Sequence, residues 1–294
     1  MTSRPRSNSS HMLTGIARAK INLYLHVTGK RPDGYHLLDS LVVFADYGDE
    51  LTVESDSSLS LEISGPFSAG IRAMDDNLIL KAARLLQEKA VVKKGAKIKL
   101  VKNLPVAAGI GGGSADASLA LQLLNELWGT GYSDRQLAEL GLSLGADVPV
   151  CLYGKPTIMA GVGELLSAGL KIPKIHIILV NCNILVSTAD VFRRLEISDT
   201  PKVGLGIEGC TEVDIISALR TAGNDLQAPA FQIAPQIESV IDEIAGETEC
   251  QLARMSGSGA TVFGLFETSE GARKAVQNIQ SRHPDWWVLA TVIN

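Results

Sequence analysis

Cysteine is scarce and scattered in this sequence. Its 294 residues contain four cysteines, Cys151, Cys182, Cys210 and Cys250, and even the closest two are 28 positions apart (182 to 210). No C-x-x-C pair exists, which disfavours a zinc site, an iron–sulfur cluster and a thioredoxin-type redox pair. Single cysteines spread over a long chain suit a reducing compartment better than a disulfide scaffold, so we expect a cytoplasmic protein.

Long apolar runs and an excess of basic charge are also absent. No apolar run reaches the roughly 18 residues of a membrane-spanning helix, so we expect no membrane span. The 32 aspartates and glutamates outnumber the 27 lysines and arginines, which gives a formal net charge of −5. This balance argues against non-specific binding to nucleic acid or to an anionic membrane, and small molecules are the expected partners. The sequence leaves the oligomeric state open.

The first 13 residues contain arginines but no apolar segment after them, so they do not resemble a secretory signal. We expect residues 1–13 to form a disordered tail outside the fold. Hydrophobic residues make up 46% of the chain and charged residues 20%, which is ordinary for a globular protein. At about 100–200 residues per domain, the length predicts two domains, which we place at 14–155 and 156–294.

The clearest strand pattern lies between Ala17 and Val27, where apolar and polar residues alternate with a period of two. Lys20 and Asn22 therefore project from the same polar face of this strand. A half-buried sheet with a solvated outer face accounts for the pattern as well as a polar wall of a binding site does.

Other elements are predicted from periodicity, caps and turn residues. Two strands are expected around Tyr47 to Asp49, followed by a helix capped by Asp76 or Asn77. Strands and helices are interleaved without strict βα alternation, which predicts an α+β fold rather than a Rossmann sheet. The further expected helices include one that carries Leu119, Leu123 and Leu127 and others at 134–144, 188–196, 211–221, 234–246 and 270–281, and the further strands lie at 97–102, 174–182, 250–255, 261–266 and 286–293.

A glycine-rich loop gives the strongest functional signal. Four glycines occupy the five positions from Gly109 to Gly113, and Ser114 follows where a helix begins. Such a loop lets the backbone approach a ligand closely, and the free N–H groups and dipole at the helix start favour an anion. A flexible hinge is the alternative. The loop matches neither the Walker A sequence nor the complete G-x-G-x-x-G dinucleotide pattern.

Three weaker signals have ordinary structural explanations when each is taken alone. Asp147 lies in the otherwise apolar segment LGADVPV, where it would act either as a general base or as a helix cap before Pro149. The segment MSGSGATVF, residues 255–263, has the composition of a tight hairpin turn, and Gly-Asn-Asp at 223–225 is also typical of a turn.

Taken together and in this order, these segments resemble the three motifs of the GHMP small-molecule kinases. The motifs are AKINLYL from Ala19, PVAAGIGGGSADA from Pro105 and MSGSGATVF from Met255, and the resemblance extends over the chain after residue 13. It implies a two-domain α+β GHMP kinase fold with the active site in the cleft between the domains. It also implies an enzyme that transfers a phosphoryl group from ATP to an alcohol.

The segment RPDGYH and the long glycine-rich loop are similar to those of one branch of this family. That branch phosphorylates the 2-hydroxyl of a methylerythritol unit carrying a cytidine diphosphate, in non-mevalonate isoprenoid biosynthesis. The alternatives are another GHMP kinase, acting on homoserine, mevalonate or a sugar, and a non-catalytic nucleotide-binding protein.

The resemblance assigns a catalytic pair and a nucleotide loop. Asp147 would accept the hydroxyl proton, while Lys20 would orient the hydroxyl and stabilise developing charge, as phosphoryl transfer requires. The chain departs from the family at Ala107, Ala108 and Ile110, where glycine and leucine are frequent, and at Ala115, where a second serine is common. The expected ATP-binding residues are Pro105, Val106, Ala107, Ala108, Gly109, Ile110, Gly111, Gly112, Gly113, Ser114 and Ala115.

The resemblance also assigns a cytosine pocket and a metal ion. The expected substrate-binding residues are Asn22, Tyr35, His36, Lys155, Thr188 and Phe192. Mg²⁺ is expected because kinases act on Mg-ATP. The sequence does not determine the ligands of this ion. Either Ser114 or Asp147 would provide an oxygen ligand, or phosphates and water would hold the ion.

Overall fold

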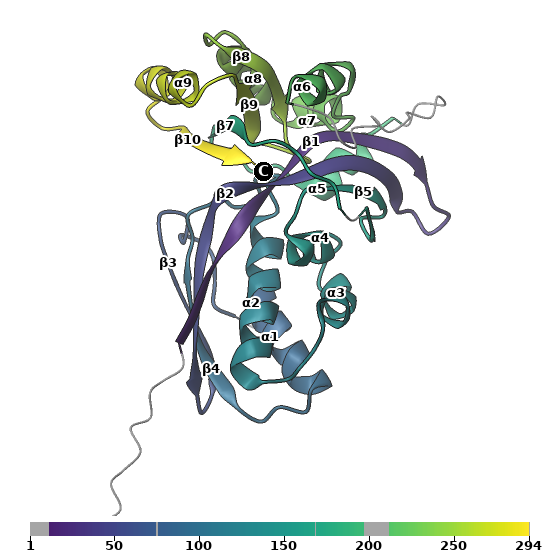
Figure 1. The fold of residues 1–294 in the computed structure, drawn as a ribbon, viewed down its shortest axis with the longest axis vertical. Coiled ribbons are helices and arrows are strands. Elements are labelled where there is room, and N and C mark those ends of the chain that lie inside the picture. Colours follow the sequence, from purple (N-terminus) through teal and green to yellow (C-terminus); the bar gives the residue numbers. More distant parts are fainter. Residues whose placement is uncertain (1–11, 75, 168, 197–211, 294) are drawn as a thin grey trace, which may run out of the picture.

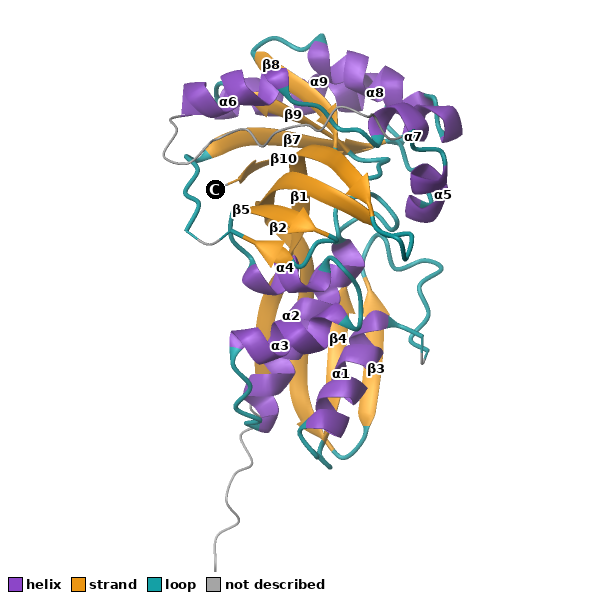
Figure 2. Ribbon diagram, turned by 90° about the vertical axis from the view of Figure 1, so that its right-hand side faces the viewer, coloured by secondary structure: helices purple, strands orange, loops and turns teal. Residues whose placement is uncertain are grey.

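The computed structural model describes residues 12–74, 76–167, 169–196 and 212–293. The predicted tail, apart from its last two residues, and Cys210 lie outside the described residues. The fold is α+β, as predicted, and two halves lie one above the other, each with helices packed against a sheet (Figures 1 and 2). No helix in the described part of the chain is both long enough and apolar enough to cross a membrane.

Two long antiparallel strands, β1 (Met12–Lys30) and β2 (His36–Asp56), run through both halves of the molecule (Figure 1). The predicted break of β2 at Tyr47–Asp49 is wrong, because the strand continues through these residues. A Cβ atom at Gly48 would lie 2.0 Å from the carbonyl oxygen of Ala17, so the close strand contact requires glycine there. Glycine therefore preserves the pairing instead of ending the strand.

The first half builds its sheet on β2, which pairs with β4 (Gly95–Val101) and with β5 (Thr157–Gly161). The strand β3 (Leu59–Ser64) lies parallel to β4, and β6 (Leu165–Leu166) pairs with β5. Aliphatic side chains of the sheet and the helices form one buried core. The helices of this half are α1 (Leu78–Lys89), α2 (Gly112–Trp128), α3 (Asp134–Leu142) and α4 (Val148–Tyr153).

The second half contains a sheet in the order β10-β7-β9-β8, and β10 joins β2 through the pair Ile293 and Ala45. Every element predicted for this half is present, and its helix α7 was not predicted. In the first half, the helix α4 and the strands β3, β5 and β6 were not predicted. The strands are β7 (Ile175–Asn181), β8 (Cys250–Met255), β9 (Val262–Phe266) and β10 (Trp287–Ile293), and the helices are α5 (Thr188–Arg193), α6 (Glu212–Thr221), α7 (Gln227–Ile233), α8 (Gln236–Ala245) and α9 (Ser269–Arg282).

The second half packs against β1. Lys20 and Asn22 on the polar face are both buried, and the backbone N–H of Asn22 donates to the Ser256 hydroxyl at 3.1 Å. The register of β1 on β2 shifts between Asn22 and Tyr24, so Tyr24 lies on the other face, and the predicted alternation does not continue through the whole strand. The guanidinium of Arg254 donates to the carbonyl of Leu23 at 2.8 Å, which holds the two halves together at this strand. The interpretation of this face as a solvated outer surface is therefore wrong.

The predicted domain boundary at residue 155 falls between α4 and β5. Because β5 pairs with β2, the sheet of the first half extends past that boundary. The division into 14–155 and 156–294 stays a prediction.

Candidate active site

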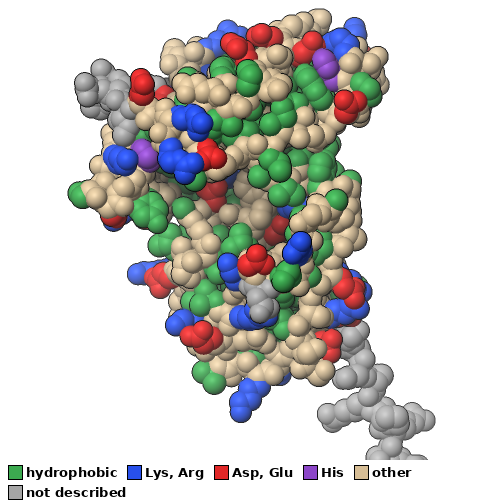
Figure 3. All heavy atoms as spheres, turned by 180° about the vertical axis from the view of Figure 1, so that it is seen from behind, with side chains coloured by type: hydrophobic (Ala, Val, Ile, Leu, Met, Phe, Trp, Pro, Cys, Tyr) green, Lys and Arg blue, Asp and Glu red, His purple; other side chains and the backbone are tan. Residues whose placement is uncertain are grey.

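A cavity of about 1020 Å³ lies between the two halves. Its walls come from β1, the glycine-rich loop, the start of α4, α5 and the β8–β9 turn. In the space-filling view the surface is hollowed between the halves (Figure 3). The volume is at the upper limit of the range for small-molecule sites.

Lys20 and Asp147 meet on the wall of this cavity. The Lys20 ammonium lies 3.1 Å from a carboxylate oxygen of Asp147, and it also donates to the amide oxygen of Asn22 at 3.0 Å. The Lys20 side chain is 5% exposed and that of Asp147 is 37% exposed. The ammonium is thus fixed by two acceptors, while the carboxylate remains open to the cavity.

Asp147 occupies the N-cap position of α4, directly before Val148 and Pro149, but its side chain makes no capping hydrogen bond. A helix cap is the ordinary explanation for an aspartate before proline, and the structure contradicts it. The carboxylate contacts Lys20 instead of the free backbone N–H groups of the helix.

The glycine-rich loop lies against Lys20 and leads into α2. Gly111 is the N-cap of this 17-residue helix, and its positive φ of 65° favours glycine. A Cβ atom at Gly111 would lie 3.2 Å from both Cβ and Cε of Lys20. Ala107 also has a positive φ, 50°, at a position where glycine is frequent in the resembling family. The helix start, with its free N–H groups, faces the cavity close to the lysine.

The two segments predicted as turns hold this loop in place. The segment from Ser256 to Thr261 does connect β8 and β9 as a hairpin, and Thr261 N–H donates to the carbonyl of Ala108 at 3.1 Å. A Cβ atom at Gly109 would lie 2.5 Å from the Ser256 carbonyl oxygen. The Asn224 amide donates to the carbonyls of Met255 and Gly257, at 2.8 Å each. The glycines of the two loops therefore allow backbone to pack directly on backbone.

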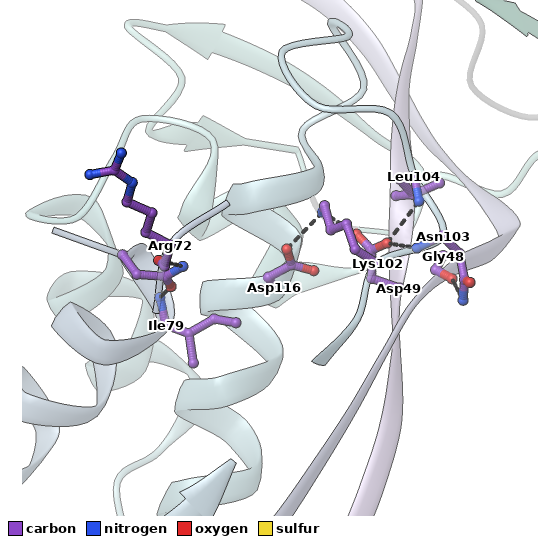
Figure 4. Close-up of polar contacts among 9 residues, drawn as sticks. Gly48, Asp49, Arg72, Ile79, Lys102, Asn103, Leu104 and Asp116 are labelled. Atoms are coloured by element: carbon purple, nitrogen blue, oxygen red, sulfur yellow. Dashed lines mark hydrogen bonds and ion pairs between the residues drawn. The ribbon is translucent and has the colours of Figure 1, made fainter. Parts of the chain in front are cut away.

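A buried ionic cluster ties the ends of the glycine-rich loop together, and sequence reasoning missed it (Figure 4). The Lys102 ammonium donates to Asp49 on β2 and, at 2.8 Å, to Asp116 near the start of α2. The other oxygen of Asp49 accepts the backbone N–H groups of Asn103, at 2.6 Å, and Leu104, at 2.8 Å. The cluster thus connects the residues before the loop with the helix after it.

The charges of this cluster do not balance. Burial would lower the pKa of Lys102, but the carboxylates of Asp116 and Asp49 outweigh burial and raise it. Burial raises the pKa of Asp116 to about 7, against the opposing effect of Lys102. One oxygen of Asp116, Oδ1, is buried with no hydrogen-bond partner among the described residues. A charged residue in the small-residue segment ADASLALQ is costly unless paired, and that signal could have identified Asp116.

The donors on the cavity wall fit a magnesium ion that is held mainly by phosphate and water. No group of three or more histidine, cysteine, aspartate or glutamate side chains gathers into a metal site in the described ranges. The hydroxyl of Ser114 and the carboxylate of Asp147 both line the cavity and are the hard oxygen donors that Mg²⁺ prefers.

The predicted cytosine residues lie at the other end of the cavity. His36 and Phe192 stack with ring centroids 4.9 Å apart and an interplanar angle of 26°, and Tyr35 is 64% exposed. Burial, and then the charge of Lys30, lowers the pKa of His36. The Thr188 hydroxyl is 2.7 Å from that of Ser258 in the β8–β9 turn, so this wall is joined to the rest of the site.

Most predicted site residues line this one cavity, including Asn22. Three do not. Lys155 is exposed and is not among the described residues that line the cavity, while the side chains of Ile110 and Ala115 are buried. Ile110 contributes through its backbone, since its carbonyl accepts the N–H of Lys20 at 2.9 Å.

Two protein-family models match the chain, the GHMP kinases N terminal domain over residues 77–155 and the GHMP kinases C terminal over residues 213–285. The 4-diphosphocytidyl-2-C-methyl-D-erythritol kinase of Dinoroseobacter shibae is 51% identical over 289 residues, which are 98% of this chain and 97% of that protein. The protein of the same name from Parvibaculum lavamentivorans is 47% identical over 94% of this chain and 96% of its own length.

Solved structures give a consistent result. A crystal structure of 4-(cytidine 5'-diphospho)-2C-methyl-D-erythritol kinase matches with a TM-score of 0.79 and 32% identity, over 96% of this chain and 99% of that chain. The homoserine kinase from Cytophaga hutchinsonii matches with a TM-score of 0.71 over 99% of this chain and 96% of that chain. At 16% identity, the homoserine kinase is similar in fold alone.

Proposed function

The chain belongs to the GHMP kinases, and on that basis we propose that Lys20, Asp147 and the glycine-rich loop carry out its phosphoryl transfer. It is an ATP-dependent kinase of 4-diphosphocytidyl-2-C-methyl-D-erythritol, whose 2-hydroxyl it phosphorylates in the methylerythritol phosphate route to isoprenoid precursors. The alternatives, a kinase of homoserine, mevalonate or a sugar and a non-catalytic nucleotide-binding protein, are not favoured.

In the proposed mechanism, Asp147 accepts the proton of the 2-hydroxyl as this oxygen attacks the γ-phosphorus, while the bond from that phosphorus to the β–γ bridging oxygen breaks and ADP leaves. The Lys20 ammonium orients the hydroxyl. It also stabilises the negative charge that develops between the hydroxyl oxygen and the phosphoryl group. The supporting observation is the 3.1 Å contact of these two side chains directly beside Gly111. A base and a cation fixed next to a phosphate-binding loop supply the positioning and electrostatic stabilisation on which phosphoryl transfer depends.

We propose that the segment from Pro105 to Ala115 holds the ATP phosphates, with the N-terminus of α2 directed at them. The Ser114 hydroxyl or the Asp147 carboxylate would contribute an oxygen to a Mg²⁺ ion, or phosphates and water would hold it. When bound, the ion would neutralise phosphate charge. The residues of the chain orient the phosphates and keep Lys20 and Asp147 in contact.

At the other end of the cavity, Tyr35, His36, Thr188 and Phe192 are proposed to hold the cytosine. Aromatic faces stack on a base, and a histidine beside them can recognise its polar edge. Asn22 is proposed to lie near the reacting hydroxyl. Lys155 stays a weaker prediction because it is exposed and away from the cavity wall.

A coupled ADP-release assay tests this function. The purified protein is given Mg-ATP with 4-diphosphocytidyl-2-C-methyl-D-erythritol, homoserine, mevalonate or galactose in parallel. We expect turnover with the cytidine substrate alone, and none without Mg²⁺. Turnover of another substrate at comparable efficiency would contradict the proposed cytosine pocket. Absence of ADP release with all four, from folded protein, would contradict the assignment of a kinase.

A further inference from the structure

A chain of buried hydrogen bonds leads from β2 to the ammonium of Lys20. The Asn22 side-chain oxygen accepts from Lys20 at 3.0 Å, and the Asn22 amide nitrogen donates to the Ser40 hydroxyl at 2.7 Å. The Ser40 hydroxyl in turn donates to the backbone carbonyl of Tyr24 at 2.6 Å. Asn22 and Ser40 are fully buried, so solvent does not compete for these groups.

The direction of every hydrogen bond in this chain is fixed by the group at its end. A backbone carbonyl only accepts, so the single proton of Ser40 is committed to Tyr24. The Ser40 oxygen must then accept from Asn22, which requires the amide nitrogen to face Ser40. An ammonium only donates, so Lys20 needs the amide oxygen on its side. The two requirements agree only in the orientation observed.

The position of Ser40 follows from an irregularity of the sheet. The register of β1 on β2 shifts between Asn22 and Tyr24, so β1 carries an extra residue there. Such a bulge disrupts the backbone ladder locally, and the Ser40 hydroxyl satisfies the carbonyl of Tyr24 at that point. The same hydroxyl thereby becomes available as the acceptor for Asn22.

We propose that Ser40 is a positioning residue for phosphoryl transfer, because it fixes the orientation of the Asn22 amide and thereby the ammonium of Lys20. This inference rests on the proposed role of Lys20. Without the serine hydroxyl, the amide can flip and turn its N–H₂ group toward the ammonium, donor against donor. Lys20 then loses one of its two acceptors and moves relative to the reacting oxygen.

The test compares Ser40→Ala with Thr157→Val in the ADP-release assay. Thr157 is a matched control, because it is also fully buried, lies opposite Val42 on the same sheet and donates to the Ser167 carbonyl at 2.8 Å. We expect Ser40→Ala to lower kcat by about tenfold to a hundredfold, the scale of a lost hydrogen bond to a charged group. Its KM values for both substrates should stay unchanged. Thr157→Val should keep the parent kcat, and Ser40→Thr, which retains the hydroxyl, should restore it.

A second background separates orientation from general stability. In Asn22→Asp the side chain presents an oxygen to Lys20 in either orientation, so adding Ser40→Ala should cause little further loss of kcat. A merely structural role of Ser40 predicts the same loss in both backgrounds. Ser40→Cys, whose thiol is a weaker donor and acceptor, should be intermediate, and it replaces the alanine variant if that one does not fold.

The inference is overturned by an unchanged kcat in Ser40→Ala or, if that variant does not fold, in Ser40→Cys. It is also overturned by equal losses in Ser40→Ala and Thr157→Val, or by equal losses in the two Asn22 backgrounds. The unmodified enzyme is assayed first, because its failure to turn over the cytidine substrate would contradict the proposed function itself. An active parent with an unaffected Ser40→Ala variant contradicts only the positioning role.

Discussion

The two ends of the cavity differ in how firmly their side chains are held. One end, which we call the phosphate end, is defined by Lys20, Asp147 and the loop from Gly109 to Ser114. Its lysine is buried and donates to two acceptors. At the cytosine end, defined by Tyr35, His36, Thr188 and Phe192, Tyr35 is 64% exposed, and the His36 and Phe192 rings are stacked on each other.

This difference corresponds to the work proposed for each end. In the proposed reaction, charge develops at the phosphate end, and fixed dipoles stabilise it best when they need no reorganisation. The cytosine end is proposed to recognise a base by stacking, which tolerates movement and needs exposed aromatic faces. Variants at the two ends should therefore affect different kinetic constants, kcat at one and substrate affinity at the other.

The largest expected effect is that of Asp147→Asn. Loss of the general base should lower turnover by about 10²–10⁴-fold, while both substrates still bind. The asparagine oxygen can still accept from Lys20, and the missing cap bond leaves little stability to lose, so the melting temperature should stay nearly unchanged. Kinetics, calorimetric binding and thermal unfolding of one preparation give all three quantities.

Lys20→Met belongs to the same test. It should also lower turnover, and the double variant should lose less than the product of the single losses, since the two residues act as a unit. Near-normal turnover of Asp147→Asn, together with a melting temperature lowered as by a lost cap, would remove the catalytic assignment.

A pair of glycines at opposite ends of α2 gives the second test of the comparison. Gly111 and Gly129 both have φ of 65°, so alanine at either position should cost about 1–2 kcal/mol of stability. At Gly111 the new methyl group would meet Lys20, at 3.2 Å, whereas at Gly129 it would have no atom within 4 Å from the described residues beyond its neighbours along the chain. Gly111→Ala should therefore also lose turnover, by up to about 10²-fold, because a misplacement of about 1 Å can cost that much.

Urea unfolding and steady-state kinetics of both variants measure these quantities. Gly129→Ala should keep the parent turnover. If both variants lose turnover equally, the strain in α2 explains the loss, and the contact between Gly111 and Lys20 is not important.

Phe192→Ala tests the cytosine end. Removing one aromatic face should weaken binding of the cytidine substrate by about 1–3 kcal/mol and leave ATP affinity unchanged. Phe67 is a matched control, because it is also half-buried and contacts an aromatic ring, Trp287, but does not line the cavity. Tyr35→Ala should behave like Phe192→Ala. Equal losses for both ligands in titration calorimetry would argue against a dedicated pocket.

The sequence predicted the parts of the site whose signals are local. Alternation along β1 places Lys20 and Asn22 on one face, and the glycines mark the loop before α2 by their density alone. The burial of that face was beyond local patterns, because it depends on Arg254 and the β8–β9 turn, more than 200 residues away. Asp147 shows the same limit, since a cap and a base have the same local sequence.

The continuity of β2 was missed for a related reason. Tyr47, Gly48 and Asp49 have the composition of a turn, yet Gly48 is there because β1 passes close to it. Asp49 is likewise explained by Lys102, which is 53 positions away. Turn chemistry and close strand packing select the same residue types, and only the partner strand distinguishes the two.

The smallest expected effect concerns the pH dependence of stability in the buried ionic cluster of Lys102, Asp49 and Asp116, beside the phosphate end. Burial raises the pKa of Asp116 from 3.8 to about 7, so the folded protein holds this proton over a range in which the unfolded chain has released it. The stability gained from the bound proton is complete below about pH 4 and is lost as the pH rises to about 7, with a slope of at most about 1.4 kcal/mol per pH unit.

Asp116→Asn keeps an acceptor for Lys102 but cannot titrate, so its stability should not fall in this way. We expect the difference in unfolding free energy between the two proteins, from urea unfolding at pH 5, 6, 7 and 8, to change up to about pH 7 and then level off. If the unfolding free energies of the two proteins changed in parallel with pH, Asp116 would be ionised throughout. Its charge would then be fully matched by Lys102, and the ionic cluster would contain no unbalanced buried charge.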